Sequence, residues 1–178
     1  MSGPKSTSDA EAGLDDFMSY EDERIAHLVR LCARGFNRSL ARRLAQHGIT
    51  FGQWVLLRIL WNREGLSQRD LSALANLTEP TTHKVLIKLE KQGIVKRKIL
   101  APNRRQQLTF LTERGRELQD VLQPLVIEAN EAALKGIPEA RRSQLRSDLI
   151  SILANLAADE AEAEAHGIKI PATRSYNQ

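Results

Sequence analysis

Five basic side chains gather on one predicted hairpin, at a density that calls for a partner of opposite charge. They are Lys96, Arg97, Lys98, Arg104 and Arg105. The first three alternate with apolar residues in the segment 94–100, and the last two follow an Ala-Pro-Asn turn signal at 101–103. The run "QLTFL" at 107–111 is typical of the returning strand. The five cations repel one another at this spacing, and a phosphate backbone would supply the anions that compensate their charge.

The excess of positive charge extends over the whole middle of the chain. Residues 24–158 contain 23 Lys and Arg against 11 Asp and Glu, whereas the formal net charge of the full sequence is only +4. The difference arises because acidic residues are concentrated in 1–23 and 159–164. Evenly spread charges would be enough for solubility, but these are clustered. The pattern therefore indicates a polyanionic partner such as nucleic acid.

Two short capped helices are predicted immediately before the hairpin. Ser67 can cap "SQRDLSALA", with Asp70 three residues later as an acidic variant of the capping box. Thr78 can cap "TEPTTHKVLIKLEKQG", with Pro80 in the first turn and Gly93 as the stop. Two such helices joined at "NLT" predict a helix-turn-helix, and the hairpin after them predicts a wing. In this arrangement the second helix enters the DNA major groove, and the wing reaches the minor groove or the backbone.

The second helix of the pair has an inner and an outer face. Spacing of i, i+3, i+4 and i+7 places four residues inward: Thr82, Val85, Leu86 and Leu89. Residues of the outer face, with neighbours on the first helix and the wing, are expected to contact DNA bases or phosphates. The predicted DNA-binding residues are Gln68, Arg69, Pro80, Thr81, His83, Lys84, Lys88, Lys98, Arg104 and Arg105. An ordinary solvated helix face is the alternative for any single member of this set.

The flanking sequence predicts longer helices. Apolar residues recur every three or four positions from 21 to about 46, and Thr50, Thr112 and Pro138 can begin three further helices. The fold class is therefore mainly α with a small β-hairpin: a winged helix-turn-helix whose N- and C-terminal helices form a dimerisation domain. The expected regions are a flexible arm at 1–20, a helical dimerisation region at 21–48 and 112–165, a DNA-binding region at 49–111 and a flexible tail at 166–178.

A homodimer is expected because the first and last helices carry more apolar surface than one small winged-helix core can cover. A symmetric pair would bury both stripes and would place two recognition helices on successive half-sites. The alternative is that these helices fold back within one chain.

Three segments resemble the MarR (multiple antibiotic resistance regulator) family of bacterial transcription factors. They are "ITFGQWVLLRIL", "GLSQRDLSALANLTEPTTHKVLIKLEKQGIVKR" and "APNRRQQLTFLTERGREL". The resemblance covers roughly 21–160 and is densest from Ile49 to Leu118. It implies a homodimer that binds a palindromic double-stranded DNA operator, usually as a repressor, and that a small phenolic or acyl ligand releases. The family's wing usually has aspartate where this chain has Asn103, and we expect a looser wing as a result.

The first helix carries a row of arginines that suggests an anionic effector. Arg30, Arg34, Arg38 and Arg42 recur at i+4 spacing, so they share one face and repel one another. A surface stripe facing DNA phosphate is one interpretation. The other is a pocket for an aromatic acyl-coenzyme A thioester, because the chain also resembles MarR members that control aromatic acid catabolism. The candidate ligand-binding residues are Arg34, Phe36, Asn37, Arg38 and Trp54.

The single cysteine, Cys32, gives no internal disulfide and raises the alternative of a redox-sensing regulator. Because Cys32 falls in the apolar stripe of the first helix, we expect an inert, buried thiol. A second alternative is an architectural protein that binds DNA without sequence preference.

Other functional classes find little support in the sequence. The four histidines are scattered, and neither a metal-ligand spacing nor a catalytic constellation is evident, so we expect no enzyme, no metal and no cofactor beyond an effector. No apolar run approaches the roughly 18 residues of a membrane span, so we expect a cytoplasmic protein without a membrane partner.

Overall fold

The computed structural model describes residues 20–99 and 107–170. The chain forms two compact units, residues 1–39 and 40–178, and each is considered by itself. The predicted N-terminal arm (except for Tyr20), the end of the predicted tail, and the wing tip with Asn103, Arg104 and Arg105 lie outside the described residues.

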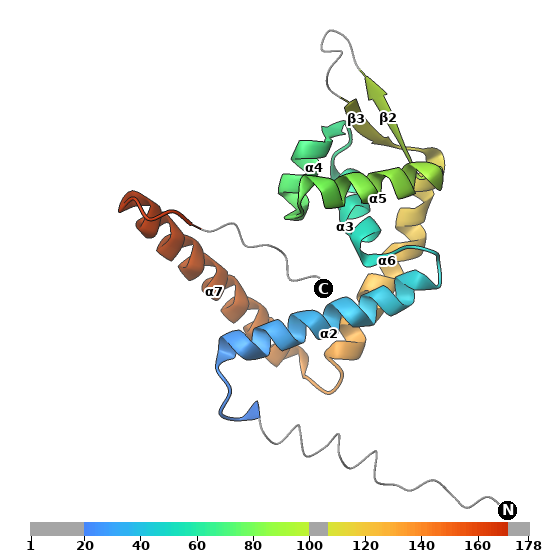
Figure 1. Cartoon of the computed structure of the whole chain (residues 1–178). Coiled ribbons are helices and arrows are strands. Elements are labelled where there is room, and N and C mark those ends of the chain that lie inside the picture. Colours follow the sequence, from blue (N-terminus) through green and yellow to red (C-terminus); the bar gives the residue numbers. More distant parts are fainter. Residues whose placement is uncertain (1–19, 100–106, 171–178) are drawn as a thin grey trace, which may run out of the picture. The chain divides into compact units, whose positions relative to one another are not determined.

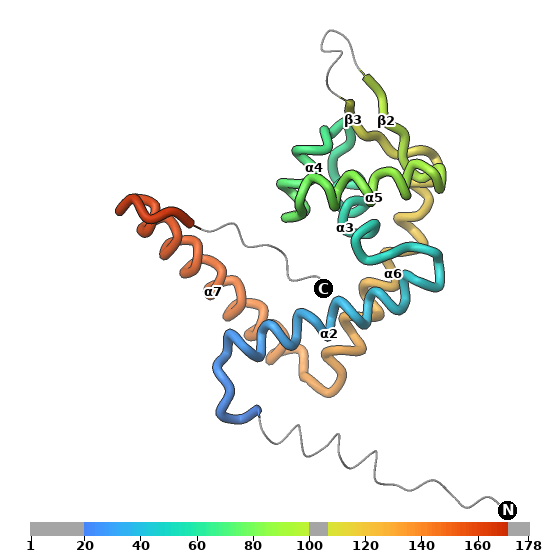
Figure 2. Tube along the Cα trace, viewed as in Figure 1, coloured from blue at the N-terminus to red at the C-terminus, as the bar shows by residue number. Residues whose placement is uncertain are grey.

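Six helices and three short strands make up the described chain (Figures 1 and 2). The helices are α2 (Ile25–Ala45), α3 (Phe51–Asn62), α4 (Gln68–Ala75), α5 (Glu79–Lys91), α6 (Glu113–Ala133) and α7 (Glu139–Ala165). The strands are β1 (Leu66–Ser67), β2 (Val95–Ile99) and β3 (Gln107–Leu111). The winged helix-turn-helix predicted from the sequence is confirmed.

Local side-chain caps explain where four of the helices begin. The hydroxyls of Thr50, Ser67, Thr78 and Thr112 each accept a hydrogen bond from the backbone N–H three residues later. Each bond satisfies one of the N–H groups that a helix start leaves unpaired. Asn76 ends α4 in the left-handed conformation, with φ of 51°, and so makes the tight turn into α5. The predicted caps are confirmed.

The sheet has one strand more than the predicted hairpin. β2 and β3 pair antiparallel, with Arg97 opposite Thr109 and Lys98 opposite Leu108. β1 adds to the other edge of β3 through Leu66 and Ser67, so the order is β1-β3-β2. Two residues are too few to show the alternation that identifies a strand in a sequence, and Ser67 also caps the next helix.

The core of the second unit lies among α3, α5, α6 and the sheet. Leu56, Leu57 and Leu60 of α3 are fully buried, together with Leu86 and Leu89 of α5. Adjacent leucines of α3 are buried because this helix is covered on more than one side. This core holds the inner surface of α5 and leaves its outer surface to solvent.

Helix α6 approaches the sheet closely through Gly115. A Cβ atom at this position would collide with the backbone oxygen of Ile94 and lie 3.1 Å from Cδ2 of Leu111. The indole N–H of Trp61 in α3 donates to the Gly115 carbonyl at 2.9 Å. The absent side chain therefore lets α6 seat the base of the wing against α3.

The apolar residues of α7 are exposed in the single chain. Among the described residues none in α7 is buried, and Leu153 is 66% exposed. The other exposed members are Leu145, Leu149, Ile150, Ile152 and Leu156. No helix in the part of the chain that the structure describes is long and apolar enough to cross a membrane.

The first unit holds the start of α2, and it differs from the sequence expectation in two respects. Helix α2 begins at Ile25 rather than at residue 21. Cys32 is exposed, not buried, and so are Ile25, Val29 and Phe36 of the same apolar stripe. The stripe has the predicted helical spacing, but these four side chains are exposed.

Candidate nucleic-acid interface

Helix α5 has the two faces that its sequence predicts. Thr82, Leu86 and Leu89 are fully buried, and Val85 is half-buried against the core. The predicted contact residues of the outer face are all exposed: Pro80, Thr81, His83, Lys84 and Lys88. Because the buried face fixes how the helix is rotated, these five predicted contact residues project together into solvent.

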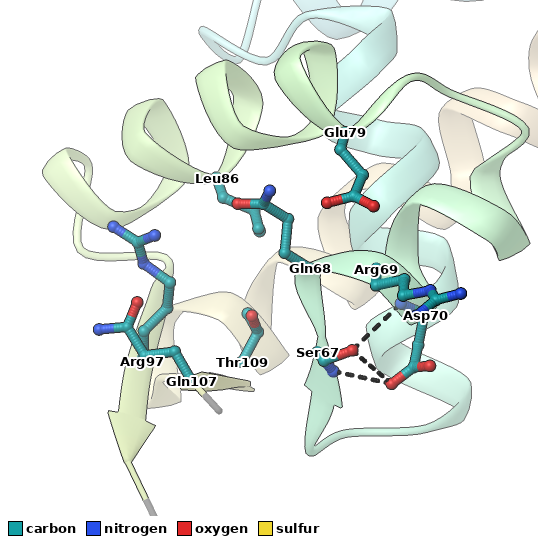
Figure 3. Close-up of a pocket in the computed structure, with 9 residues that line it drawn as sticks. All are labelled: Ser67, Gln68, Arg69, Asp70, Glu79, Leu86, Arg97, Gln107 and Thr109. Atoms are coloured by element: carbon teal, nitrogen blue, oxygen red, sulfur yellow. Dashed lines mark hydrogen bonds between the residues drawn. The ribbon is translucent and has the colours of Figure 1, made fainter. Parts of the chain in front are cut away.

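The start of α4 borders the same surface. Gln68 and Arg69 are its first two residues, half-buried and exposed respectively. The Ser67 hydroxyl and backbone N–H both donate to Oδ2 of Asp70, at 2.6 and 3.2 Å, and complete the capping box (Figure 3). These hydrogen bonds, more than the nearby arginines, hold the pKa of Asp70 below its ordinary value of 3.8.

A side-chain hydrogen bond joins the two helices at their outer surface. Nδ1 of His83 in α5 lies 2.9 Å from Oε1 of Gln68 in α4. Gln68 projects from the start of α4 towards α5 (Figure 3). Sequence reasoning placed both residues at the interface but did not pair them, because they are 15 positions apart.

A shallow cavity of about 570 Å³ separates α4 from the wing strands (Figure 3). Its lining residues are Ser67, Gln68, Arg69, Asp70, Glu79, Leu86, Arg97, Gln107 and Thr109. The Thr109 hydroxyl is buried and has no hydrogen-bond partner among the described residues. The lining mixes both signs of charge, so the cavity is less cationic than the outer face of α5.

The wing strand β2 is tied to the recognition helix by an ion pair. Nε of Arg97 donates to Oε2 of Glu90 at 3.0 Å, and Nη2 of Arg97 donates to the same oxygen. The hydrogen bonds from Arg97 outweigh desolvation and hold the pKa of Glu90 below its ordinary value of 4.5. The sequence interpretation counted Arg97 among the unpaired wing cations. This is a correction: its charge is compensated within the chain.

The remaining wing cations described by the structure stay open to solvent. Lys96 and Lys98 of β2 are exposed. In the view of Figure 1, β2 and β3 lie above α5. Lys98 belongs to the predicted DNA-binding set, and its side chain is open to solvent.

The candidate effector residues fall into both units. Arg34, Phe36 and Arg38 of α2 are exposed, and Asn37 is half-buried, all within residues 1–39. Trp54 belongs to the second unit, where it is only 8% exposed. The guanidinium of Arg58 lies 5.2 Å from the centroid of its ring, and the Phe51 ring centroid lies 5.5 Å away. Trp54 therefore already has packing and cation–π partners.

The physical properties of this surface suit double-stranded DNA. A helix of this width fits the major groove, and its exposed lysines and polar groups can meet phosphates and base edges. Within the described ranges, no group of three or more His, Cys, Asp or Glu side chains could hold a metal ion. The chemistry that the arrangement offers is hydrogen bonding and charge compensation.

Comparison with known proteins agrees with this geometry. Residues 49–106 match the model of the MarR family. The transcriptional regulator TtmR of Methylorubrum extorquens is 29% identical over 175 residues, 98% of this chain and 86% of that protein. A transcriptional repressor of Mycobacterium bovis is 26% identical over 126 residues, 71% of this chain and 91% of its own length.

Solved structures show the same architecture. A MarR family regulator from Listeria monocytogenes, complexed with a 26mer DNA, has 26% identity and a TM-score of 0.65 over 84% of this chain and 99% of that chain. MarR from E. coli, in its apo form, has a TM-score of 0.70 at 19% identity, over 75% of this chain and 98% of that chain.

Proposed function

We propose that this chain recognises a specific operator sequence. The family model and the similar proteins support a DNA-binding transcriptional regulator of the MarR family. The outer face of α5 carries the proposal: its exposed Thr81, His83 and Lys84 stand on a helix whose opposite face is locked into the core. A rigid reading helix is what distinguishes sequence-specific recognition from binding by positive charge alone.

The proposed contacts divide by chemistry. Thr81, His83 and Lys84 read base edges, together with the apolar surface of Pro80. Gln68 at the start of α4 acts at the same surface through its hydrogen bond to His83. The backbone phosphates are held by Arg69 of α4, Lys88 of α5, and Lys98, Arg104 and Arg105 of the wing. Phosphate contacts set the register of the protein on the duplex, and base contacts set the preferred sequence.

The proposed assembly is a homodimer on a palindromic operator. A second copy would cover the exposed apolar residues of α7. It would also cover the exposed apolar residues of α2. Two-fold symmetry in the protein would require two half-sites about one helical turn apart. The helical segments 21–48 and 112–165 supply this dimerisation region in the proposal, and 49–111 supplies the DNA-binding region.

The proposed regulation is repression that a small aromatic effector relieves, in the cytoplasm where the operator lies. An aromatic acyl-coenzyme A thioester would suit the exposed arginine row of α2 because it combines phosphates with an apolar end. Arg34, Phe36, Asn37, Arg38 and Trp54 remain the candidate contacts. A free aromatic acid would engage the arginines less, since it lacks the phosphates.

The test is a fluorescence anisotropy titration of the protein with duplex from upstream of its own gene, at several salt concentrations. Duplex of random sequence is the control. We expect much tighter binding to the upstream duplex, and release by thioesters rather than by the matching free acids. Equal affinity for both duplexes would overturn sequence-specific regulation. Tight specific binding that no aromatic thioester or acid alters would overturn the effector proposal alone.

A further inference from the structure

The orientation of His83 is set by Gln68, and this fixes which atom of its ring faces outward. The oxygen of a primary amide can only accept a hydrogen bond. Because Oε1 of Gln68 lies 2.9 Å from Nδ1 of His83, the proton of that bond belongs to Nδ1. In the neutral ring the other nitrogen, Nε2, then carries a lone pair and accepts.

The Nε2 lone pair lies on the exposed outer face of α5. His83 is exposed on the outer face of α5, one turn into the helix, beside Thr81 and Lys84. Gln68 is also fixed, since it is the first residue of α4 and follows the capping box of Ser67. With α5 in the major groove, as proposed above, an acceptor at this point would face the edges of bases.

We propose that Gln68 and His83 form a reading pair that selects amino bases over keto bases at one position of each half-site. In the major groove adenine offers its N6 amino group and cytosine its N4 amino group, which are donors that Nε2 can accept from. Guanine and thymine present O6 and O4 at the corresponding place, and two acceptors facing each other leave both without a proton.

The inference rests on the proposed function and makes it more specific. It predicts a base preference of an unusual kind, in which A and C are enriched together against G and T on the same strand. His83 is the residue that contacts the base. Gln68 is a positioning residue, because it acts by holding the proton on Nδ1.

The free protein provides the first test. Long-range ¹H–¹⁵N NMR at pH 8, where an imidazole is ordinarily neutral, distinguishes the two tautomers of a histidine. We expect His83 with its proton on Nδ1 in the wild type, and loss of this tautomer bias in Gln68→Met, which removes the acceptor at similar side-chain size. His166 is an internal reference, because its Nδ1 lies 2.8 Å from the carbonyl oxygen of Glu162. A proton on Nε2 of His83 in the wild type would overturn the proposal.

Selection from a random duplex library provides the second test. We expect the wild type to enrich A and C together at one position of each half-site by about threefold to tenfold, the worth of one hydrogen bond. His83→Ala and Gln68→Met should both lose that preference while the rest of the selected sequence persists. Gln119→Met, an exposed control on α6, should change nothing.

The outcomes separate this inference from the proposed function. Three results would overturn the reading pair alone. The selected sequence could be unchanged in His83→Ala, it could be unchanged in Gln68→Met, or it could change at a position where the wild type selects G or T. If the wild type selects no sequence at all, the proposed operator recognition fails, and the reading pair fails with it.

Discussion

Arg97 in β2 and Glu90 in α5 form an ion pair that joins the wing to the recognition helix, with Nε of Arg97 at 3.0 Å from Oε2 of Glu90. Their side chains are 16% and 39% exposed, so solvent screens the pair only in part. The hairpin and the helix that are proposed to contact neighbouring grooves are thereby linked by side chains as well as by the connecting backbone.

This pair makes the stability of the second unit sensitive to acid. Because the folded-state pKa of Glu90 lies below 4.5, its contribution is present above that pH and is lost as pH falls through the folded-state value. We expect Glu90→Gln to lower the free energy of unfolding at pH 7 by about 1 kcal/mol or less, as for a partly screened pair. Urea denaturation from pH 7 to pH 3 checks this.

The matched control for that measurement is Glu117→Gln, at an exposed site on α6. The gap between wild type and Glu90→Gln should close as the pH falls, whereas Glu117→Gln should remain close to wild type throughout. A gap that stays constant down to pH 3 would show that the carboxylate charge is not what stabilises the contact.

Lys98 is predicted to contribute a phosphate contact. Replacing it in Lys98→Gln should weaken binding to upstream and random duplex alike and lower the slope of log affinity against log salt by about 0.9, the value for one contact on duplex DNA. Lys135→Gln, which removes the same charge just after α6, is the control. Equal salt slopes for the two variants would exclude Lys98 from the interface.

Gly115 is predicted to be essential for packing rather than for recognition. A methyl group there collides with the Ile94 backbone oxygen, which cannot move without shifting the strand. Gly115→Ala should therefore cost about 1–3 kcal/mol of stability, measured by thermal or urea unfolding. Gly52→Ala is the control, since its Cβ would lie 3.6 Å from Cγ2 of Val85 and make an ordinary contact. If Gly115→Ala proves as stable as Gly52→Ala, α6 is not held by this close approach.

The dimer is predicted to depend on the exposed apolar residues of α7. Leu153→Glu should yield a monomer at micromolar concentration, because the charge would have to be buried in the interface. Ser151→Glu places the same charge on the same helix at a polar position. Size-exclusion chromatography with light scattering distinguishes the two. A wild-type monomer, or a Leu153→Glu variant that remains dimeric, would contradict the proposed interface.

Much of the winged helix-turn-helix was predictable because its signals are local. The start of α4 is indicated by Ser67 and Asp70, and the start of α5 by Thr78 and Pro80, each pair within three residues of sequence. The rotation of α5 followed from the spacing of its buried side chains. Contacts between distant residues were not predictable in this way. The hydrogen bond between Gln68 and His83 and the ion pair between Glu90 and Arg97 produce no periodic pattern in the sequence.

The errors have physical causes of the same kind. The strand β1 is only two residues long and hydrogen-bonds to a partner more than 40 residues away. Cys32 lies on a stripe with the spacing of a buried face, yet the side chain is exposed in the single chain. Periodicity indicates which residues would be covered, but not whether the same chain provides the cover.

The central claim is that α5 reads bases in the major groove, and dimethyl sulfate footprinting tests it most directly. The reagent methylates N7 of guanine, which faces that groove. On duplex from upstream of the gene, the wild type should protect guanines in two half-sites about one helical turn apart. Lys84→Gln should lose part of this protection. Protection that is absent, or that is spread evenly along any duplex, would contradict sequence reading by α5.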